Sequence, residues 1–467
     1  MSSRRAATTG SAPRRRSDVG PAPVTDRAVA AERFVAAHRA FAANGGGTAP
    51  AWLREMRAGG IARFAELGFP TTNLEEWRFT SVAPLIETVF TVPHGEAVPG
   101  PSASELEPHL LRGVGRHRMV FVNGRFAPAL SALDGLPEGV TVASLGDVLR
   151  REPERLGVLL GEVTAPRTAF SALNTAFLSD GAFVHVQAGV EVAEPLQVLY
   201  FTTGAAEPVL THPRTLIIVE RVAKVEVVES YAGAAGAVYW TNAVTDIVVG
   251  AGARAEVYRV QRESEGAFHV AATQTRQGRD SVVRVHALVF GAALARHDIA
   301  TVLDGEGASC LLNGLYLAHG AQHIDHHTVI DHAQPHAESH EYFNGVLDDR
   351  SRGVFNGRIV VRPGAQRTDS KQTNNNLLLS EEARADSQPQ LEIYADDVKC
   401  THGATLGPID DKAFFYLRSR GLGAAEARAM LTYGFGAEIL GRIESPVLRR
   451  HLDELVRARL LCGSTAA

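Results

Sequence analysis

The β-rich texture of residues 119–409 limits the possible folds of this chain more than any other feature. Short runs rich in Val, Ile, Tyr and Phe recur there about every 8–12 residues, separated by Gly, Asn or Asp. The clearest runs are Met119–Val122, Phe183–Val186, Thr215–Val219, Val225–Val228, Ala255–Val260 and Val282–Phe290. The stretch continues for roughly 300 residues with a helical pattern only around Ala165–Leu178. It therefore favours an all-β stack of coils over a simple sandwich, although no fixed sequence repeat accompanies it.

A helical pattern precedes this stretch. We expect a first helix to end at Gly45-Gly46-Gly47. A second helix is expected over Ala51–Leu67, with an interruption near Gly59-Gly60. Asn73 followed by Glu76 resembles an N-cap with its capping partner at the start of a short helix.

Helices also follow the β-rich stretch. Ala424–Leu440 is helical in pattern, and Ser445-Pro446 is a good start for a last helix. These helices could cap the open edge of the β-body, or they could present an amphipathic surface to another subunit. We expect four segments in all: a disordered, Arg-rich tail (1–25), an N-terminal helical domain (26–115), a β-coil core (116–409) and a C-terminal helical domain (410–467).

Composition excludes several classes of function. The net charge is −5, which argues against nucleic acid and anionic membranes as partners, and no run of about 18 apolar residues could span a membrane. The three cysteines are widely spaced and never form C-x-x-C, so a reducing, cytoplasmic setting is expected. No P-loop and no G-x-G-x-x-G turn occurs, so any ATP-driven work would depend on a partner that hydrolyses the nucleotide.

Cys400 and His402 are the first candidate site. They lie two residues apart in a strand-like stretch, so their side chains should share one face, with Cα atoms about 6.5–7 Å apart. Thiol and imidazole suit iron, zinc or iron–sulfur chemistry, but about four ligands are needed for a closed site. The missing ligands would come from elsewhere in the chain or from another subunit. Alternatively, Cys400 packs as a small hydrophobe beside a hydrogen-bonded histidine.

A dense histidine cluster is the second candidate. Seven of the 18 histidines fall in one short stretch: His319, His323, His326, His327, His332, His336 and His340. With Glu338 or Glu341 they could form the metal site of a metal-dependent β-fold enzyme. However, His326 and His327 must point to opposite faces of any strand, and stacked coils also place like residues in structural ladders. A carbohydrate-active β-helix is a weaker alternative, because it would need carboxylates facing one groove and usually a signal peptide.

A series of motifs carries a family resemblance. The motifs are Glu75–Arg78, Gly353–Val361, Asn376–Ser380, Pro389–Ile393, Asp396–Gly407 and Phe415–Gly421. Together they resemble the SufB/SufD family of iron–sulfur cluster assembly proteins, most densely over residues 320–440. The Lys399–Thr405 stretch is similar to the SufD branch, because Gly403 stands where the SufB branch has a glutamate. The missing acid argues that this chain is not the principal scaffold subunit.

The resemblance implies a right-handed parallel β-helix between N-terminal and C-terminal helical domains. It implies a heterodimer with a SufB-like paralogue through the β-helices, and a SufC-like ATPase held by the C-terminal helices. The expected ATPase-contact residues are Phe414, Phe415, Tyr416, Leu417, Arg418 and Arg420. The functionally important histidine of the SufD branch falls on His402, with Cys400 as its neighbour.

The expected function is therefore a non-catalytic subunit of a SufBCD scaffold complex that assembles clusters and supports iron acquisition. A transient iron or iron–sulfur cluster would be held at the interface with the SufB-like partner, and a homodimer is possible for the isolated chain. The family has also been associated with reduced flavin, but no flavin motif is visible in this sequence.

Overall fold

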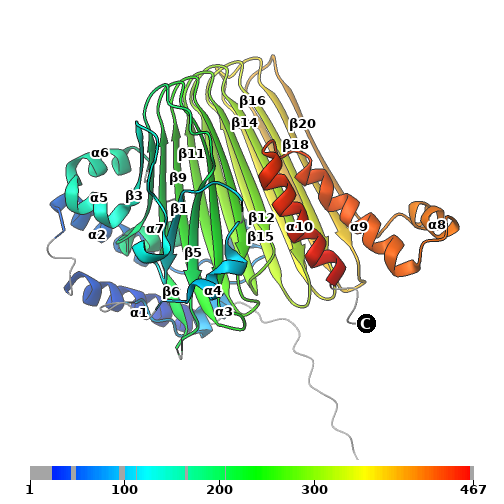
Figure 1. Cartoon of the computed structure of the whole chain (residues 1–467), viewed down its shortest axis with the longest axis horizontal. Helices are drawn as coiled ribbons and strands as arrows, with labels where there is room; N and C mark the ends of the chain where they lie inside the picture. Colours follow the sequence, from blue (N-terminus) through cyan, green and yellow to red (C-terminus); the bar gives the residue numbers. More distant parts are fainter. Residues whose placement is uncertain are drawn as a thin grey trace, which may run out of the picture.

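Two ten-stranded sheets form the body of the protein, and from residue 214 onward successive strands alternate between them (Figure 1). The computed structural model describes residues 24–43, 49–93, 100–111, 113–163, 167–205 and 207–462. The expected disordered tail (1–25) lies almost wholly outside these residues. About eight parallel turns span residues 181–407, which confirms the predicted parallel β-helix.

The first sheet, sheet B, contains every second strand from residue 224 onward and three earlier strands. Its members in chain order are β1 (Arg118–Val122), β2 (Arg125–Phe126), β5 (Leu196–Thr202), β8 (Lys224–Gly233), β10 (Arg254–Arg262), β12 (Val282–Val289), β14 (Ser309–Ala318), β16 (Glu338–Leu347), β18 (Asp369–Leu378) and β20 (Lys399–Gly407). The second sheet, sheet A, contains β3 (Val140–Ser144), β4 (Gly181–Val186), β6 (Val209–Thr211), β7 (Arg214–Val219), β9 (Tyr239–Val249), β11 (Phe268–Gln277), β13 (Leu294–Leu303), β15 (His323–His332), β17 (Arg352–Val361) and β19 (Arg384–Ile393).

The register explains both the core and the missing sequence repeat. Along sheet B, Ala255 pairs with Val283, Val283 with Cys310 and Cys310 with Ser339, and all four side chains are buried. Alternate residues of each strand thus stack into inward-facing columns, as the two-residue period of a strand requires. The number of residues between successive members of a column differs from coil to coil. This variation is why no fixed period is visible in the sequence.

Short helices cover the N-terminal end of the solenoid. They are α1 (Val24–Ala43), α2 (Ala51–Leu67), α3 (Ala83–Glu87), α4 (Ala103–Leu106), α5 (Leu145–Arg151), α6 (Pro153–Val163) and α7 (Ala169–Ala176), with 3-10 segments at Glu75–Trp77, Glu107–His109 and Pro128–Leu130. Helix α7 is the helix expected around residues 165–178. Helices α5 and α6 were not expected; they bury Leu145, Leu156 and Leu160 against Leu53 of α2.

Two local expectations were wrong. Helix α2 runs through Gly59-Gly60 without a break. Gly60 lies directly against α7, where an added Cβ would stand 2.8 Å from the backbone nitrogen of Ala176. Close helix contact, and not helix termination, explains this glycine. Asn73 does not cap a helix; the following segment is a 3-10 turn whose N-cap is Leu74, with no side-chain capping bond.

Three helices follow the solenoid: α8 (Asp411–Ser419), α9 (Ala424–Leu440) and α10 (Pro446–Cys462). Helices α9 and α10 cover the outer face of sheet B, where Ile439 and Leu452 pack with Tyr258 and Leu315 (Figure 1). They do not cap the open edge at β20. Helix α8 extends away from the body and has no buried residue. None of the helices in the described ranges is long and apolar enough to cross a membrane.

Candidate functional site

Cys400 and His402 lie on β20, the last strand of sheet B. In the described chain β20 pairs only with β18, so its other edge is open. Cys400 stands beside Ser370 and His402 beside Gln372 in the register, and both β18 side chains are buried inside the solenoid. The two candidate residues therefore continue inward-facing columns at the open end of the β-helix.

The Cys400 thiol is half-buried and packs against the apolar core of the solenoid. Partial burial, and secondarily the carboxylate of Asp369, raise its pKa above the ordinary thiol value. At neutral pH the thiol is therefore mainly protonated, and an incoming cation would be needed to stabilise the thiolate. The His402 side chain is exposed, and its imidazole makes no hydrogen bond to a described residue.

Behind His402 the column continues to a buried carboxyl group. Gln372 donates from Nε2 to Oε2 of Glu341 at 2.6 Å, and Glu341 is fully buried. Burial raises the pKa of Glu341 to about 7, although the hydrogen bonds that it accepts oppose the rise. Since Glu341 lies two strands inside the edge, it does not join Cys400 and His402 as a third ligand.

The seven histidines of residues 319–340 do not converge. His326 lies inside the solenoid, with its ring centroid 5.2 Å from that of Tyr316. The next residue, His327, faces outward, and its Nε2 is 3.1 Å from Oδ1 of Asp325. Others pair separately: His319 with Glu265, His323 with Thr80, His332 with Ser339 and His340 with Glu338. Across the described residues no three His, Cys, Asp or Glu side chains gather as metal ligands, so this cluster offers no site for the metalloenzyme alternative.

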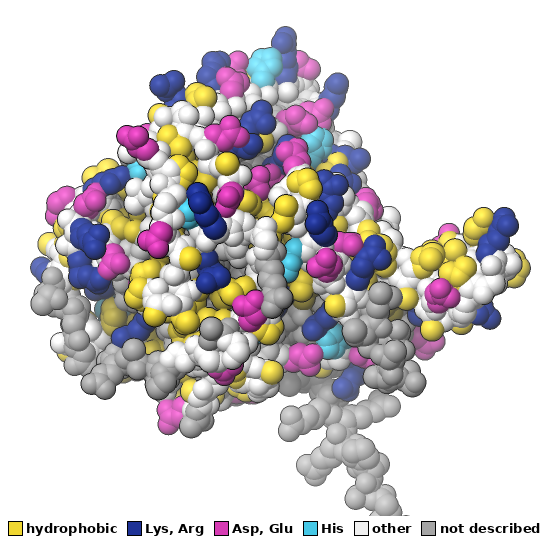
Figure 2. Space-filling view, viewed as in Figure 1, with side chains coloured by type: hydrophobic (Ala, Val, Ile, Leu, Met, Phe, Trp, Pro, Cys, Tyr) yellow, Lys and Arg dark blue, Asp and Glu magenta, His cyan; other side chains and the backbone are white. Residues whose placement is uncertain are grey.

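The expected ATPase-contact residues lie on and just after α8. Phe415 and Tyr416 are 73% and 55% exposed, which is unusual for aromatic side chains. Phe414 and Leu417 are half-buried, while Arg418 and Arg420 are exposed. Figure 2 shows apolar side chains on this protruding segment, at the right of the view.

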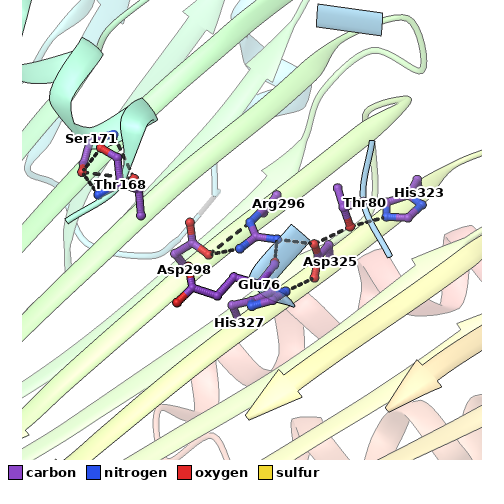
Figure 3. Close-up of polar contacts among 9 residues, drawn as sticks. All are labelled: Glu76, Thr80, Thr168, Ser171, Arg296, Asp298, His323, Asp325 and His327. Carbon is purple, nitrogen blue, oxygen red and sulfur yellow. Dashed lines mark hydrogen bonds and ion pairs between the residues drawn. The ribbon is translucent and has the colours of Figure 1, made fainter. Parts of the chain in front are cut away.

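The structure also reveals a polar cluster that sequence reasoning missed. Arg296 on β13 lies between Asp298 and Asp325, with N–O distances of 2.8 Å to both, and donates to the backbone oxygen of Glu76 (Figure 3). Its guanidinium carbon is 3.7 Å from the centre of the Trp77 ring. In the sequence, only the family resemblance of residues 75–78 pointed to this region. That resemblance did not predict Arg296 on β13 as the partner of these residues.

The same cluster extends to the segment that follows Trp77. The Thr80 hydroxyl donates to Asp325 at 2.5 Å and lies 2.8 Å from Nε2 of His323 (Figure 3). Burial opposes ionisation of Asp325, but His327 and Arg296 hold the pKa of this carboxyl well below its usual range. Burial lowers the pKa of His323 to about 4. The cluster is therefore an ionic and hydrogen-bonded attachment of the N-terminal region to sheet A.

Comparisons with known proteins agree with this architecture. Residues 200–435 match the family model described as SUF system FeS cluster assembly, SufBD core domain, and residues 35–198 match the SufBD protein N-terminal region. The border between these two matches falls inside the solenoid.

Relatives with assigned names match over nearly the whole chain. An iron–sulfur cluster assembly SufBD family protein of Synechocystis is 34% identical over 427 residues, covering 89% of this chain and 93% of the relative. The iron–sulfur cluster assembly protein SufD of Escherichia coli is 32% identical, covering 91% and 96%. SufD of Bacillus subtilis is 25% identical, covering 88% and 94%. With its two family matches, its parallel β-helix and these relatives, the chain belongs to the SufBD family of iron–sulfur cluster assembly proteins.

Proposed function

We propose that this chain is the SufD-like, non-catalytic subunit of a SufBCD-type scaffold, and that a SufB-like paralogue pairs with its open β-helix end. The observation that carries the proposal is the placement of Cys400 and His402 on one face of the terminal strand β20, whose outer edge has no strand partner in the described chain. Two soft ligands are too few to hold iron or a cluster, so the partner would supply the rest. Iron or a nascent cluster is the cargo of this site.

The edge itself supports association. The unpaired edge of a strand exposes backbone groups that readily pair with another strand. Around the end of the solenoid, Ile393, Tyr394 and Leu406 are 41%, 62% and 58% exposed, an apolar surface that a partner would cover. Gly403 stands where the SufB branch has a glutamate. The absence of this carboxylate supports the proposal that the chain is the SufD-like subunit and not the principal scaffold.

Helix α8 is the proposed contact for a SufC-like ATPase, because its aromatic side chains stand clear of the body. Nucleotide binding to the ATPase would favour one arrangement of the C-terminal helices, and with it one state of the Cys400/His402 interface. Such coupling works only if the nucleotide binds that arrangement more tightly.

Native mass spectrometry of the tagged chain, isolated without oxygen from its own cells, tests the proposal. We expect a mass that fits this chain, a paralogue and ATPase subunits, with iron that is lost in His402→Ala and reduced in Cys400→Ser. Thr401→Ala is the matched control, because Thr401 is adjacent but faces the other side of β20. A lone chain or homodimer that retains one tightly bound metal in all variants would overturn the proposal.

A further inference from the structure

A recess of about 330 Å³ opens on the outer face of sheet A and shares no lining residue with β20 or α8. Side chains of β11, β13, β15 and β17 form its floor, while the start of α7 and the Glu75–Trp77 segment form its walls. Figure 3 shows Thr168 and Ser171 on the α7 side, apart from the Arg296 cluster. The volume is at the lower end of the range for small-molecule sites.

The two walls carry charges of opposite sign. Arg296 and Asp298 neutralise each other within the cluster described above. Arg167, just before α7, forms no ion pair in the described chain, and neither does the carboxylate of Glu76. Arg358 on the floor has one ion-pair partner among the described residues, Glu392, whose Oε1 is 3.5 Å from its Nη1. The recess thus presents Arg167 on the α7 wall, Arg358 on the floor, and the carboxylates of Glu75 and Glu76 on the other wall.

An amide in the floor also has no hydrogen-bond partner among the described residues. Asn356 on β17 lines the recess beside His327 and is only 8% exposed. Its carboxamide makes no hydrogen bond to any described residue. The carboxamide is not sealed off from the recess, so it can hydrogen-bond there to a polar ligand or to ordered water.

We propose that the recess binds a small zwitterion of the α-amino acid type. Its carboxylate would meet Arg167 and Arg358, and its ammonium group would meet the carboxylates of Glu75 and Glu76. Charge-assisted hydrogen bonds of this kind are the stronger class. The small apolar floor side chains of Ala300 and Val329 leave room for a ligand side chain.

Other ligand classes fit the lining less well. It contains no Phe, Tyr or Trp on which a base could stack, and its three arginines are matched by three carboxylates, so a nucleotide is disfavoured. A bound zwitterion would bridge the N-terminal region and β17. It would therefore stabilise the folded chain in proportion to its occupancy.

The test mixes the full-length chain with each of the common L-amino acids at millimolar concentration and measures Tm by thermal unfolding. The amino acid that raises Tm most is then titrated calorimetrically. We expect at least one amino acid to raise Tm in a concentration-dependent manner. Its carboxamide, which lacks the carboxylate, and its N-acetyl derivative, which lacks the ammonium group, should both fail to bind.

Variants locate the site. Arg358→Gln and Glu76→Gln should each weaken binding by about tenfold or more, since each removes a charged hydrogen-bond partner. Arg276→Gln is the matched control: it removes an outward arginine of sheet A that pairs with Asp304 outside the recess. The proposal is overturned if no amino acid binds, if either derivative binds as well as the parent amino acid, or if both recess variants bind normally.

Discussion

The guanidinium carbon of Arg296 on β13 lies over the ring of Trp77, 3.7 Å from its centre, and this contact joins the N-terminal region to sheet A of the solenoid. Arg296 is only 2% exposed, and its charge is balanced by Asp298 and Asp325. The contact connects two segments that are far apart in the sequence. Through this contact the N-terminal region packs directly against sheet A of the β-helix.

Loss of this arginine should therefore be strongly destabilising. Arg296→Met leaves Asp325 buried without its cation, which typically costs about 3–5 kcal/mol. Denaturant unfolding followed by circular dichroism would measure the change. Arg276→Met is the control, because Arg276 is 59% exposed and such surface pairs contribute only about 0–1 kcal/mol. Equal effects of the two substitutions would contradict the assigned role.

The two adjacent glycines of α2 should respond in opposite ways to alanine. Gly60→Ala places a Cβ 2.8 Å from the backbone of α7 and should destabilise by about 1–3 kcal/mol. Gly59→Ala meets nothing within 4 Å and should stabilise by about 0.5–1 kcal/mol through better helix propensity. The difference in Tm between the two variants is the measurement. If Gly60→Ala were as stable as Gly59→Ala, α2 and α7 would not be in close contact.

Buried histidines should make the fold sensitive to acid. Burial lowers the pKa of His326 to about 4, so the unfolded chain binds a proton at higher pH than the folded chain does. Stability should then fall as pH falls from about 6.5 toward 4, by up to roughly 3 kcal/mol from this group. His326→Phe should flatten that slope, because a phenyl ring suits the aromatic surroundings and cannot be protonated.

The control for this pH series is His336→Asn. His336 is exposed at a turn with φ of 58°, a backbone conformation that asparagine tolerates. Its replacement should leave the acid slope unchanged. An unchanged slope in His326→Phe would show that His326 is hydrated in the folded state.

Glu341 should produce the opposite pH dependence. Because burial raises its folded pKa to about 7, the folded chain binds the proton more tightly than the unfolded chain, and stability should fall as pH rises from about 4.5 through 7. Glu341→Gln keeps an acceptor for Gln372 and removes the ionisation. Above pH 7 it should be more stable than the parent by up to roughly 3 kcal/mol, with no difference below the unfolded pKa.

Glu338→Gln on the same strand provides the comparison for Glu341. The Glu338 side chain is 52% exposed and pairs with His340 at the surface, so its replacement should change stability little at any pH. Urea titrations at several pH values would separate the two variants. A Glu341→Gln variant that is less stable at pH 8 would mean that the buried group is ionised and held by its neighbours.

The sequence alone determined the coil architecture and the candidate pair on the last strand. Alternation of inward and outward residues has a period of two, so a short stretch is enough to predict that Cys400 and His402 share a face. The helix Ala424–Leu440 was likewise predicted from its local sequence pattern. These features depend on residues close together in the chain.

Only the tertiary structure decided which distant residues meet. It turned the face of Cys400 and His402 toward the interior at an open edge, separated the histidines of residues 319–340, and placed Trp77 under Arg296. It also made Gly60 a close-contact residue within an unbroken helix. Coil lengths vary along the solenoid, so the register between strands, and with it every contact between coils, cannot be counted from the sequence.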